Sequence, residues 1–200
     1  SLTIFTLHKM IKAFNQDQVF ENVNFSGRSP EAADYENCNF TGCDFSDSDL
    51  ADLNFMECTF DGCNLSLTKL TNTTLRETRF VRCKLLGLHF EDCNKTLMSL
   101  DFENCIIELC SFYRLKLSRT RFVSSKISEA DFTEADLMES SFTGSDLQRS
   151  VFRNTNLEGV DFRTAVNYSI DPDLNRIKRA RFSLAGIGGL LDKFGIEIES

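Results

Sequence analysis

Large apolar residues recur at every fifth position of this chain, and this period restricts the fold more than any other feature of the sequence. The series runs from Phe20 to Phe90, interrupted only at Pro30, and resumes after a two-residue shift from Leu97 to Phe162. An α-helix repeats about every 3.6 residues and a strand about every two, so neither matches a period of five. The pattern instead predicts a solenoid whose chain bends after each group of five. The 19 Phe, with no Trp, are then explained as core residues.

The position two residues before each central residue is mostly small, and all eight cysteines fall there. A buried cysteine behaves as a small hydrophobic residue, so we interpret the thiols as core filler. The chain has no CxxC pair, which removes the usual zinc and redox spacings. We therefore expect no metal and no cofactor. The eight are Cys38, Cys43, Cys58, Cys63, Cys83, Cys93, Cys105 and Cys110.

Four groups of five, each followed by a bend, close one square coil, and the charges offer a test of this arrangement. Residues 20 apart would stack on neighbouring coils, where opposite charges are favourable. From residue 97 to 182 no like-charged pair occurs at this spacing, whereas opposite charges are frequent. The pairs are Asp101/Arg121, Arg114/Glu134, Lys116/Asp136, Arg119/Glu139, Lys126/Asp146, Glu129/Arg149, Arg153/Asp173, Glu158/Lys178 and Asp161/Arg181.

The segments 130–137 (ADFTEADL) and 145–149 (SDLQR) resemble the pentapeptide-repeat family, and the resemblance extends over roughly residues 20 to 183. It implies an all-β fold, a right-handed quadrilateral β-helix of about eight coils. The central residue and the small residue of each group of five would stack inside. The hand of the coil comes from the resemblance alone.

We expect three parts: a capping segment at residues 1–19, the β-helix at 20–183, and a C-terminal helix and dimerisation tail at 184–200. The conformation of the first part is left open, because both helical and five-residue spacings occur in it. The phase shift at residues 94–96 is interpreted either as a bulge on one edge of a coil or as a binding loop.

Ser183 is a suitable N-cap for a helix from about Leu184 to Phe194, although its glycines weaken that helix. Residues 195–199 alternate like a short strand. The segment either covers the last coil or forms a dimer contact. The resemblance favours the dimer, because gyrase-directed family members join at their C-termini. The candidate interface residues are Ile187, Leu190, Leu191, Phe194, Ile196 and Ile198.

The net charge of −8 is concentrated near the N-terminus. Residues 34 to 61 contain eight acidic residues and no basic one, and only Asp49 has a basic residue, Lys69, 20 positions further on. This run is either a solubilising surface or an interaction face for a basic groove. The eight are Asp34, Glu36, Asp44, Asp47, Asp49, Asp52, Glu57 and Asp61.

An acidic chain is a poor direct ligand of nucleic acid, because phosphates require Lys and Arg. The basic run at residues 176–181 does not alter this expectation, since Lys178 and Arg181 would stack on Glu158 and Asp161. No secretory signal is present, and no apolar run approaches the ~20 residues of a membrane span. We therefore expect a cytoplasmic protein that binds neither nucleic acid nor membranes.

Nothing in the sequence indicates catalysis. His8 and His89 are the only histidines, and no nucleophile-elbow, zinc-protease, phosphate-loop or dinucleotide motif occurs. Acidic residues on a filled solenoid form exposed rows, whereas paired catalytic carboxylates need a cleft. We therefore expect no enzymatic activity.

Four segments carry a more specific resemblance, to the gyrase-interacting resistance proteins of the AlbG, McbG, Qnr and MfpA type. They are residues 63–67, 80–87, 166–171 and 177–184. The resemblance implies a DNA mimic that binds DNA gyrase or a related type II topoisomerase and confers immunity to albicidin-, microcin- or quinolone-like poisons. The chain lacks the two long inserted loops of the Qnr type, which argues against Qnr-like protection. The alternative is a structural or regulatory interaction scaffold unrelated to gyrase.

Overall fold

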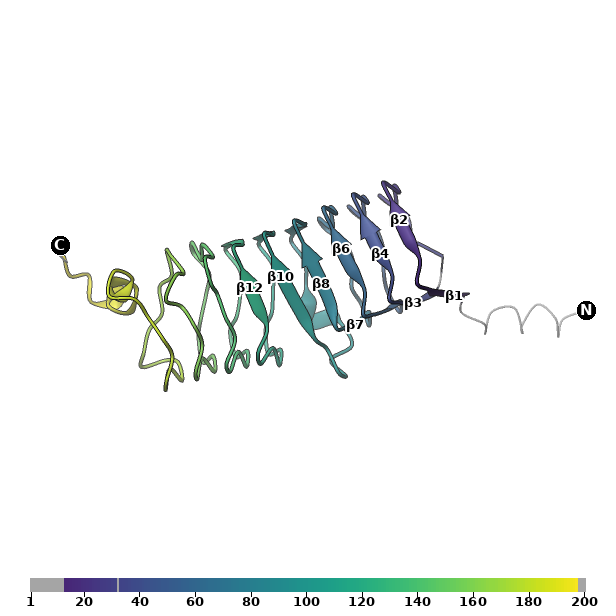
Figure 1. Cartoon of the computed structure of the whole chain (residues 1–200). Coiled ribbons are helices and arrows are strands. Elements are labelled where there is room, and N and C mark those ends of the chain that lie inside the picture. Colours follow the sequence, from purple (N-terminus) through teal and green to yellow (C-terminus); the bar gives the residue numbers. More distant parts are fainter. Residues whose placement is uncertain (1–12, 32, 198–200) are drawn as a thin grey trace, which may run out of the picture.

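The computed structural model describes residues 13–31 and 33–197, in which the chain winds as a parallel β-solenoid (Figure 1). The strands are β1 (Ala13–Gln16), β2 (Val19–Glu21), β3 (Ala33–Glu36), β4 (Asn39–Thr41), β5 (Asn54–Met56), β6 (Thr59–Asp61), β7 (Thr74–Arg76), β8 (Thr78–Val81), β9 (Lys84–Leu86), β10 (Leu100–Glu103), β11 (Ile106–Glu108), β12 (Arg121–Val123) and β13 (Lys126–Ser128). Three 3₁₀ helices accompany them: η1 (Phe90–Asp92), η2 (Ile187–Leu190) and η3 (Asp192–Phe194). No helix among the described residues is long and apolar enough to cross a bilayer.

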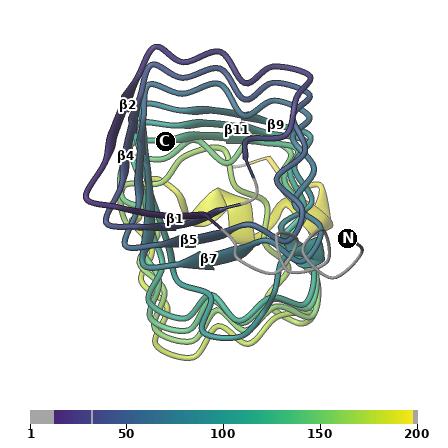
Figure 2. The ribbon, with the colours of Figure 1, turned by 90° about the vertical axis from the view of Figure 1, so that its right-hand side faces the viewer.

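Successive coils stack to form four faces, and the view along the axis has a four-sided outline (Figure 2). Face A contains β1, β3, β5 and β7, and face B contains the six-stranded sheet from β2 to β12. Face C contains β9, β11 and β13 with further isolated bridges, and face D consists of isolated bridges alone, such as Asp49 with Lys69. The predicted quadrilateral β-helix is therefore confirmed. One column of face C passes through Asn24, Asp44, Asn64, Lys84, Ile106, Lys126, Asp146 and Val166.

The predicted central residues fill the interior as stacks of rings. Within one face the rings stack in parallel, as Phe112 and Phe132 do with centroids 4.9 Å apart and planes at 3°. Rings from the opposite faces B and D meet edge to face, as Phe122 and Phe132 do at 5.7 Å and 88°. Aromatic pairs favour both offset-stacked and edge-to-face contacts. The abundance of Phe follows from this cross-section, because two facing rings span the core.

The bends lie two residues after each central residue, where the backbone adopts positive φ. Gly62 has φ +63 and Asn72 has φ 54 at such corners. Glycine and asparagine tolerate this left-handed conformation better than other residues do. The corner N–H groups donate to the next coil, as Gly62 does to the Val81 carbonyl at 2.8 Å. Most corners therefore turn the chain while their amide donates to the next coil.

All eight cysteines are buried free thiols, which confirms their interpretation as core filler. Their Sγ atoms donate to carbonyl oxygens, as Cys63 does to Phe40 at 3.2 Å. Burial raises the pKa of Cys58, Cys93 and Cys110 to about 12. Within the described ranges, no group of three or more His, Cys, Asp or Glu side chains is arranged to hold a metal ion.

The phase shift is a bulge on face A. Asn94 still pairs with Thr74, at the regular distance of one coil along the chain, whereas Leu100 pairs with Thr78, two positions out of that register. The two additional residues therefore lie between residues 94 and 100, close to the position expected from the sequence.

The bulge corrects one predicted core residue. Leu97, where the five-residue series was expected to resume, is 67% exposed and has φ 58. The bulge turns Leu97 outward, and Met98 packs against the core instead. The inward series therefore resumes at Phe102, which is fully buried.

The C-terminal segment differs from the expected α-helix between Leu184 and Phe194, because it forms only η2 and η3. Ser183 does cap this segment, since its Oγ accepts a hydrogen bond from the Gly186 N–H at 3.1 Å. A Cβ on Gly189 would lie 2.2 Å from the carbonyl oxygen of Tyr168. The glycines therefore permit close packing on the last coil, which side chains at Gly186 and Gly189 would prevent.

The two ends also differ in detail from the expected boundaries. β1 pairs in register with β3, with Ala13 beside Ala33, so the regular coil includes residue 13 of the expected 1–19 cap. Residues 1–12 lie outside the described part of the chain. Residues 195–197 form no strand, and Ile198 and Glu199 lie outside the described residues.

Candidate interaction surfaces

The eight acidic residues between 34 and 61 form a belt around the N-terminal coils rather than one flat face; we call them the acidic belt. Asp34 and Glu36 belong to β3 on face A, and Asp61 ends β6 on face B. Asp44 lies on face C and Asp49 on face D. The remaining three occupy corners with positive φ and are Asp47, Asp52 and Glu57.

Several carboxylates of the acidic belt bond to asparagine on the next coil, an arrangement that the sequence reasoning missed. The Nδ2 atoms of Asn54 and Asn72 donate to Asp34 at 2.5 Å and to Asp52 at 2.7 Å. An amide donor satisfies a carboxylate oxygen without neutralising its charge. The signal was present in the sequence, because asparagine stands one coil further along the chain from three of these acids, including Asp44.

Asp44 shows how hydrogen bonds affect the ionisation of a carboxylate in the acidic belt. Its Oδ1 accepts the Ser46 N–H at 2.9 Å and the Asn64 amide at 3.3 Å. The hydrogen bond from the Ser46 backbone, followed by that from the Ser46 side chain, holds the pKa of Asp44 below its usual value. The carboxylate is therefore charged throughout the neutral range.

Two members of the acidic belt have other neighbours. Asp61 forms an ion pair with Arg82 at 2.5 Å, so its charge is compensated. Glu57 and Glu77 occupy the same corner on neighbouring coils, which places two like charges there. Asp49 and Lys69 share a bridge, as the sequence spacing predicted, but no ion pair joins these two described side chains.

The second half of the solenoid carries five of the nine predicted ion pairs between coils, whereas Lys116 with Asp136 and Lys126 with Asp146 share bridges without an ion pair between these described side chains. Glu158, however, binds Arg176 at 2.7 Å instead of Lys178. Asp173 binds Lys193 instead of Arg153. The predicted pairs that form are Arg114 with Glu134 (2.6 Å), Arg119 with Glu139 (2.8 Å), Arg121 with Asp101 (3.4 Å), Arg149 with Glu129 (2.5 Å) and Arg181 with Asp161 (3.0 Å).

The C-terminal end of the solenoid exposes apolar side chains. Phe194 is 62% exposed and Ile196 is 56% exposed, and Ile187 is also exposed. Leu191 is half-buried. Leu190 packs against the core, so it belongs to the cap rather than to the free surface. Of the expected interface residues, Ile198 lies outside the described part.

Lys193 fastens the C-terminal segment to the last coil. Its Nζ lies 2.7 Å from Asp171 and also binds Asp173. The hydrogen bond from Lys193 is the main reason that the pKa of Asp171 lies below its usual value. The same contacts raise the pKa of Lys193.

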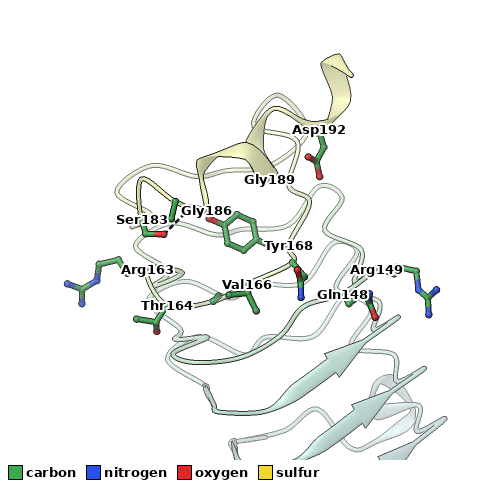
Figure 3. A pocket seen from close by; sticks show the side chains of 13 residues that line it. Gln148, Arg149, Arg163, Thr164, Val166, Tyr168, Ser183, Gly186, Gly189 and Asp192 are labelled. Atoms are coloured by element: carbon green, nitrogen blue, oxygen red, sulfur yellow. Dashed lines mark hydrogen bonds between the residues drawn. The ribbon is translucent and has the colours of Figure 1, made fainter. Parts of the chain in front are cut away.

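A groove of about 650 Å³ lies between this cap and the last coils (Figure 3). Tyr168 lies beneath Gly186 and Gly189, while the side chains of Arg149 and Arg163 point away from the groove. Those two arginines bind Glu129 and Asp161. The Tyr168 hydroxyl is buried and has no hydrogen-bond partner among the residues that the structure describes, and burial raises its pKa. The groove therefore offers no cluster of titratable groups for acid–base chemistry.

His89 is placed as expected for a solvated side chain. It is exposed, and its Nδ1 lies 3.1 Å from the Glu91 carboxylate. The surfaces with unusual chemistry are thus the acidic belt and the apolar C-terminal end, and both are suited to contact with another macromolecule.

Comparison with known proteins agrees with this architecture. A trypsin-treated variant of QnrB1, described as a plasmid-mediated fluoroquinolone resistance protein, is similar with a TM-score of 0.70 and 16% identity, covering 94% of this chain and 98% of that one. HetL from the cyanobacterium Nostoc sp. strain PCC 7120, described as involved in heterocyst differentiation regulation, is similar with a TM-score of 0.53 and 15% identity, covering 92% and 94%. At these identities the likeness shows the fold.

No curated protein matches the sequence significantly. A family model described as the pentapeptide repeat region matches residues 33–100 and 89–164, which is more than half of the chain. This protein belongs to the pentapeptide-repeat family.

Proposed function

We propose that this protein binds DNA gyrase or a related type II topoisomerase as a partial mimic of DNA, and so confers resistance or immunity to gyrase poisons. It acts in the cytoplasm, without catalysis, by occupying a basic surface that otherwise holds DNA. The observation that carries the proposal is the acidic belt, whose amide-bonded carboxylates keep their charge. Negative charge on a narrow rod favours approach to a basic groove.

The dimensions are consistent with this role. The described coils number about eight along face C, and at ~4.8 Å per coil the rod is roughly 40 Å long. Duplex DNA carries one charge per ~1.7 Å, a much higher density, so the mimicry is partial. The fold likeness to QnrB1, a resistance protein, adds support. The absence of long inserted loops favours an albicidin- or microcin-like poison over a quinolone.

A gyrase assay tests the proposal directly. Supercoiling and poison-dependent DNA cleavage are measured with purified protein, in the presence and absence of albicidin or ciprofloxacin. The protein is expected to reduce cleavage by at least one poison. The proposal is wrong if it neither inhibits supercoiling nor lowers cleavage.

The acidic belt is tested by removing charge while keeping the turns. The triple variant Asp44→Asn, Asp47→Asn and Asp52→Asn is expected to weaken gyrase binding and to unfold at the same temperature. Asparagine already occupies the positions equivalent to Asp44 and Asp52 on the next coil, at Asn64 and Asn72, so the fold accepts it there.

A matched control removes the same charge from the distal coils. The variant Asp131→Asn, Asp136→Asn and Asp146→Asn is expected to bind gyrase as the wild type does. Equal weakening by both triple variants would indicate an effect of net charge, and an unchanged affinity in the first would place the contact elsewhere.

We further propose that two copies join through the apolar C-terminal end. Burying Phe194 and Ile196 against a second copy would remove exposed apolar surface from water. Light scattering is expected to show a dimer for the wild type and a monomer for Leu191→Asp with Phe194→Asp. Leu97→Asp, on the distant bulge, serves as the control. A dimer that persists in the double variant would contradict this interface.

A regulatory scaffold is the competing function, and the likeness to HetL favours it. The gyrase assay separates the two. A well-folded dimer that has no effect on gyrase would support the scaffold.

A further inference from the structure

Three exposed leucines in the described part of the chain occupy positive-φ positions that otherwise carry polar residues or glycine, and two of them lie in one corner column. Among the described non-glycine residues with positive φ, only Leu67, Leu97 and Leu109 are apolar. Leu67 has φ 58 and is 55% exposed, and Leu109 has φ 54 and is 53% exposed. A bulky side chain is unfavourable in this conformation, and its exposure to water is a second cost. Asparagine or glycine would be preferred for stability alone.

Leu67 and Leu109 belong to one corner column, between faces C and D, and Gly87 lies between them. The Leu67 N–H donates to Leu86 at 2.8 Å, and the Gly87 N–H donates to Glu108 at 2.9 Å, which places the three corners on successive coils. A Cβ on Gly87 would lie 3.0 Å from Cδ2 of Leu67. The Leu67 side chain therefore lies over Gly87, in the space that a side chain at position 87 would need.

Face C extends this apolar surface beside the corner. Ile106 is 46% exposed and lies in register between Lys84 and Lys126. Leu86 is half-buried and pairs with Glu108. The four apolar residues around Gly87 form what we call the corner patch: Leu67, Leu86, Ile106 and Leu109.

The charges around the corner patch differ from those of the rest of this acidic chain. Lys84 and Lys126 flank Ile106 on face C, and Lys69 follows Leu67 onto face D. All three lysines are exposed, and none forms an ion pair with a described residue. Glu108 is the acid inside the patch, and Asp47 and Glu129 end the corner column, the latter paired with Arg149. Asp49 lies beside Lys69 and Asp146 beside Lys126 in the bridge register, without an ion pair between these described side chains. The three ammonium groups therefore remain available to carboxylates of a partner.

We propose that the corner patch binds an acidic segment of a partner protein, which packs one bulky apolar side chain against the exposed Leu67 and Leu109. Carboxylates on either side of that side chain reach Lys69, Lys84 and Lys126. An apolar core enclosed by a polar rim is the usual arrangement of a protein interface. The patch takes a partner of the opposite charge to that attracted by the acidic belt, so it is independent of gyrase binding.

A displayed peptide library provides the probe. Peptides are selected on the wild-type protein, and the affinity of the enriched peptides is measured by fluorescence anisotropy. Enriched peptides are expected to contain a large apolar residue flanked by Asp or Glu. Their binding is expected to weaken with added salt, because the lysine contacts are screened.

The test variant is Leu67→Asn with Leu109→Asn. It is expected to lose at least about tenfold in peptide affinity while unfolding at the same or a higher temperature, because asparagine relieves both leucine corners. Leu97→Asn makes the same exchange at the third leucine corner and is expected to leave the affinity unchanged. Lys84→Gln with Lys126→Gln is expected to reduce the affinity and flatten its salt dependence.

Several results would overturn the proposal. They are failure to enrich acidic peptides, binding that Leu67→Asn with Leu109→Asn does not weaken, and equal weakening by Leu97→Asn. Loss of the dimer in the leucine variant would assign the patch to a second copy of this chain. Wild-type binding to phosphatidylserine vesicles in place of peptides would assign it to a membrane surface.

Discussion

The chemical reactivity of a side chain in this protein depends on its position in the group of five. The cysteine thiols illustrate this dependence. Cys58 and Cys110 lie two residues before a central Phe and have a pKa of about 12, because burial disfavours the thiolate. The thiolate is the reactive form of cysteine. Position, rather than residue type, therefore makes these cysteines chemically inert.

We expect the native protein to react negligibly with a disulfide reagent at a pH of about 8, since all eight thiols are buried and out of reach of the reagent. All eight should react once the protein is unfolded in guanidinium. The absorbance of the thiolate released from the reagent measures the extent of reaction in the native and in the unfolded protein. Rapid reaction of several thiols in the folded protein would contradict the burial of the cysteine columns.

A central Phe contributes through stacking on both neighbouring coils. Phe122 lies 5.0 Å from Phe102 and 4.8 Å from Phe142, measured between ring centroids. Phe122→Ala is expected to lower the free energy of unfolding by about 3–5 kcal/mol, because it leaves a cavity. Phe122→Leu is expected to cost less, since leucine occupies other central positions. Denaturant titration measures both, and the exposed Val151→Ala is the control, expected to change stability by less than about 0.5 kcal/mol.

At the scale of the element, the C-terminal cap depends on close approach to Tyr168. A Cβ on Gly189 would meet the backbone oxygen of Tyr168, which has no room to move aside. Gly189→Ala is expected to displace the cap and to increase amide exchange in residues 184–197. Gly195→Asn is the matched control, because nothing lies within 4 Å of that position and asparagine tolerates its φ of +59. Unchanged exchange in Gly189→Ala would contradict this packing.

The cap is also expected to loosen at low pH. The pKa of Asp171 lies below its usual value of 3.8, because Lys193 binds the charged form. A carboxyl group with a lowered pKa stabilises the folded state above its usual pKa, and this contribution disappears as the pH falls through the lowered value. Amide NMR signals of residues 187–194 should report the loosening. Asp171→Asn with Asp173→Asn should remove this pH dependence.

The whole molecule is electrostatically asymmetric. Three carboxylates of the acidic belt are bonded to asparagine amides, whereas the distal coils carry ion pairs such as Arg114 with Glu134. Like charges repel across the belt, and salt screens that repulsion over about 10 Å at 0.1 M. One fold therefore combines a region under repulsion with a region of paired charge.

Raising the salt concentration is expected to protect the two halves differently. Amide exchange should slow in residues 33–62, because repulsion within the acidic belt is screened. Exchange in residues 100–165 should stay constant or rise slightly, since screening weakens the ion pairs there. Mass spectrometry of exchanged peptides measures both. The same response in both halves would contradict the asymmetry.

The five-residue period was sufficient to predict the four-sided solenoid, its core and the role of the cysteines, because it states which side chains point inward. Leu97 was assigned wrongly, because the spacing locates a shift without showing where the additional residues bulge. The C-terminal helix was also expected wrongly. Helical spacing of apolar residues does not reveal that Gly186 and Gly189 lie against Tyr168.

For the candidate surfaces, the sequence by itself determined the register: residues 20 apart meet, and 34–61 carry the uncompensated acids. Only the tertiary structure decided which outward neighbours bind. Glu158 forms its ion pair with Arg176 instead of Lys178. Asparagine amides donate hydrogen bonds to carboxylates of the acidic belt. The physical reason is that the period sets inward and outward positions by backbone geometry alone. Outward side chains are long enough to contact any of several neighbours. Which contact forms depends on the length and the orientation of the side chains in the folded protein.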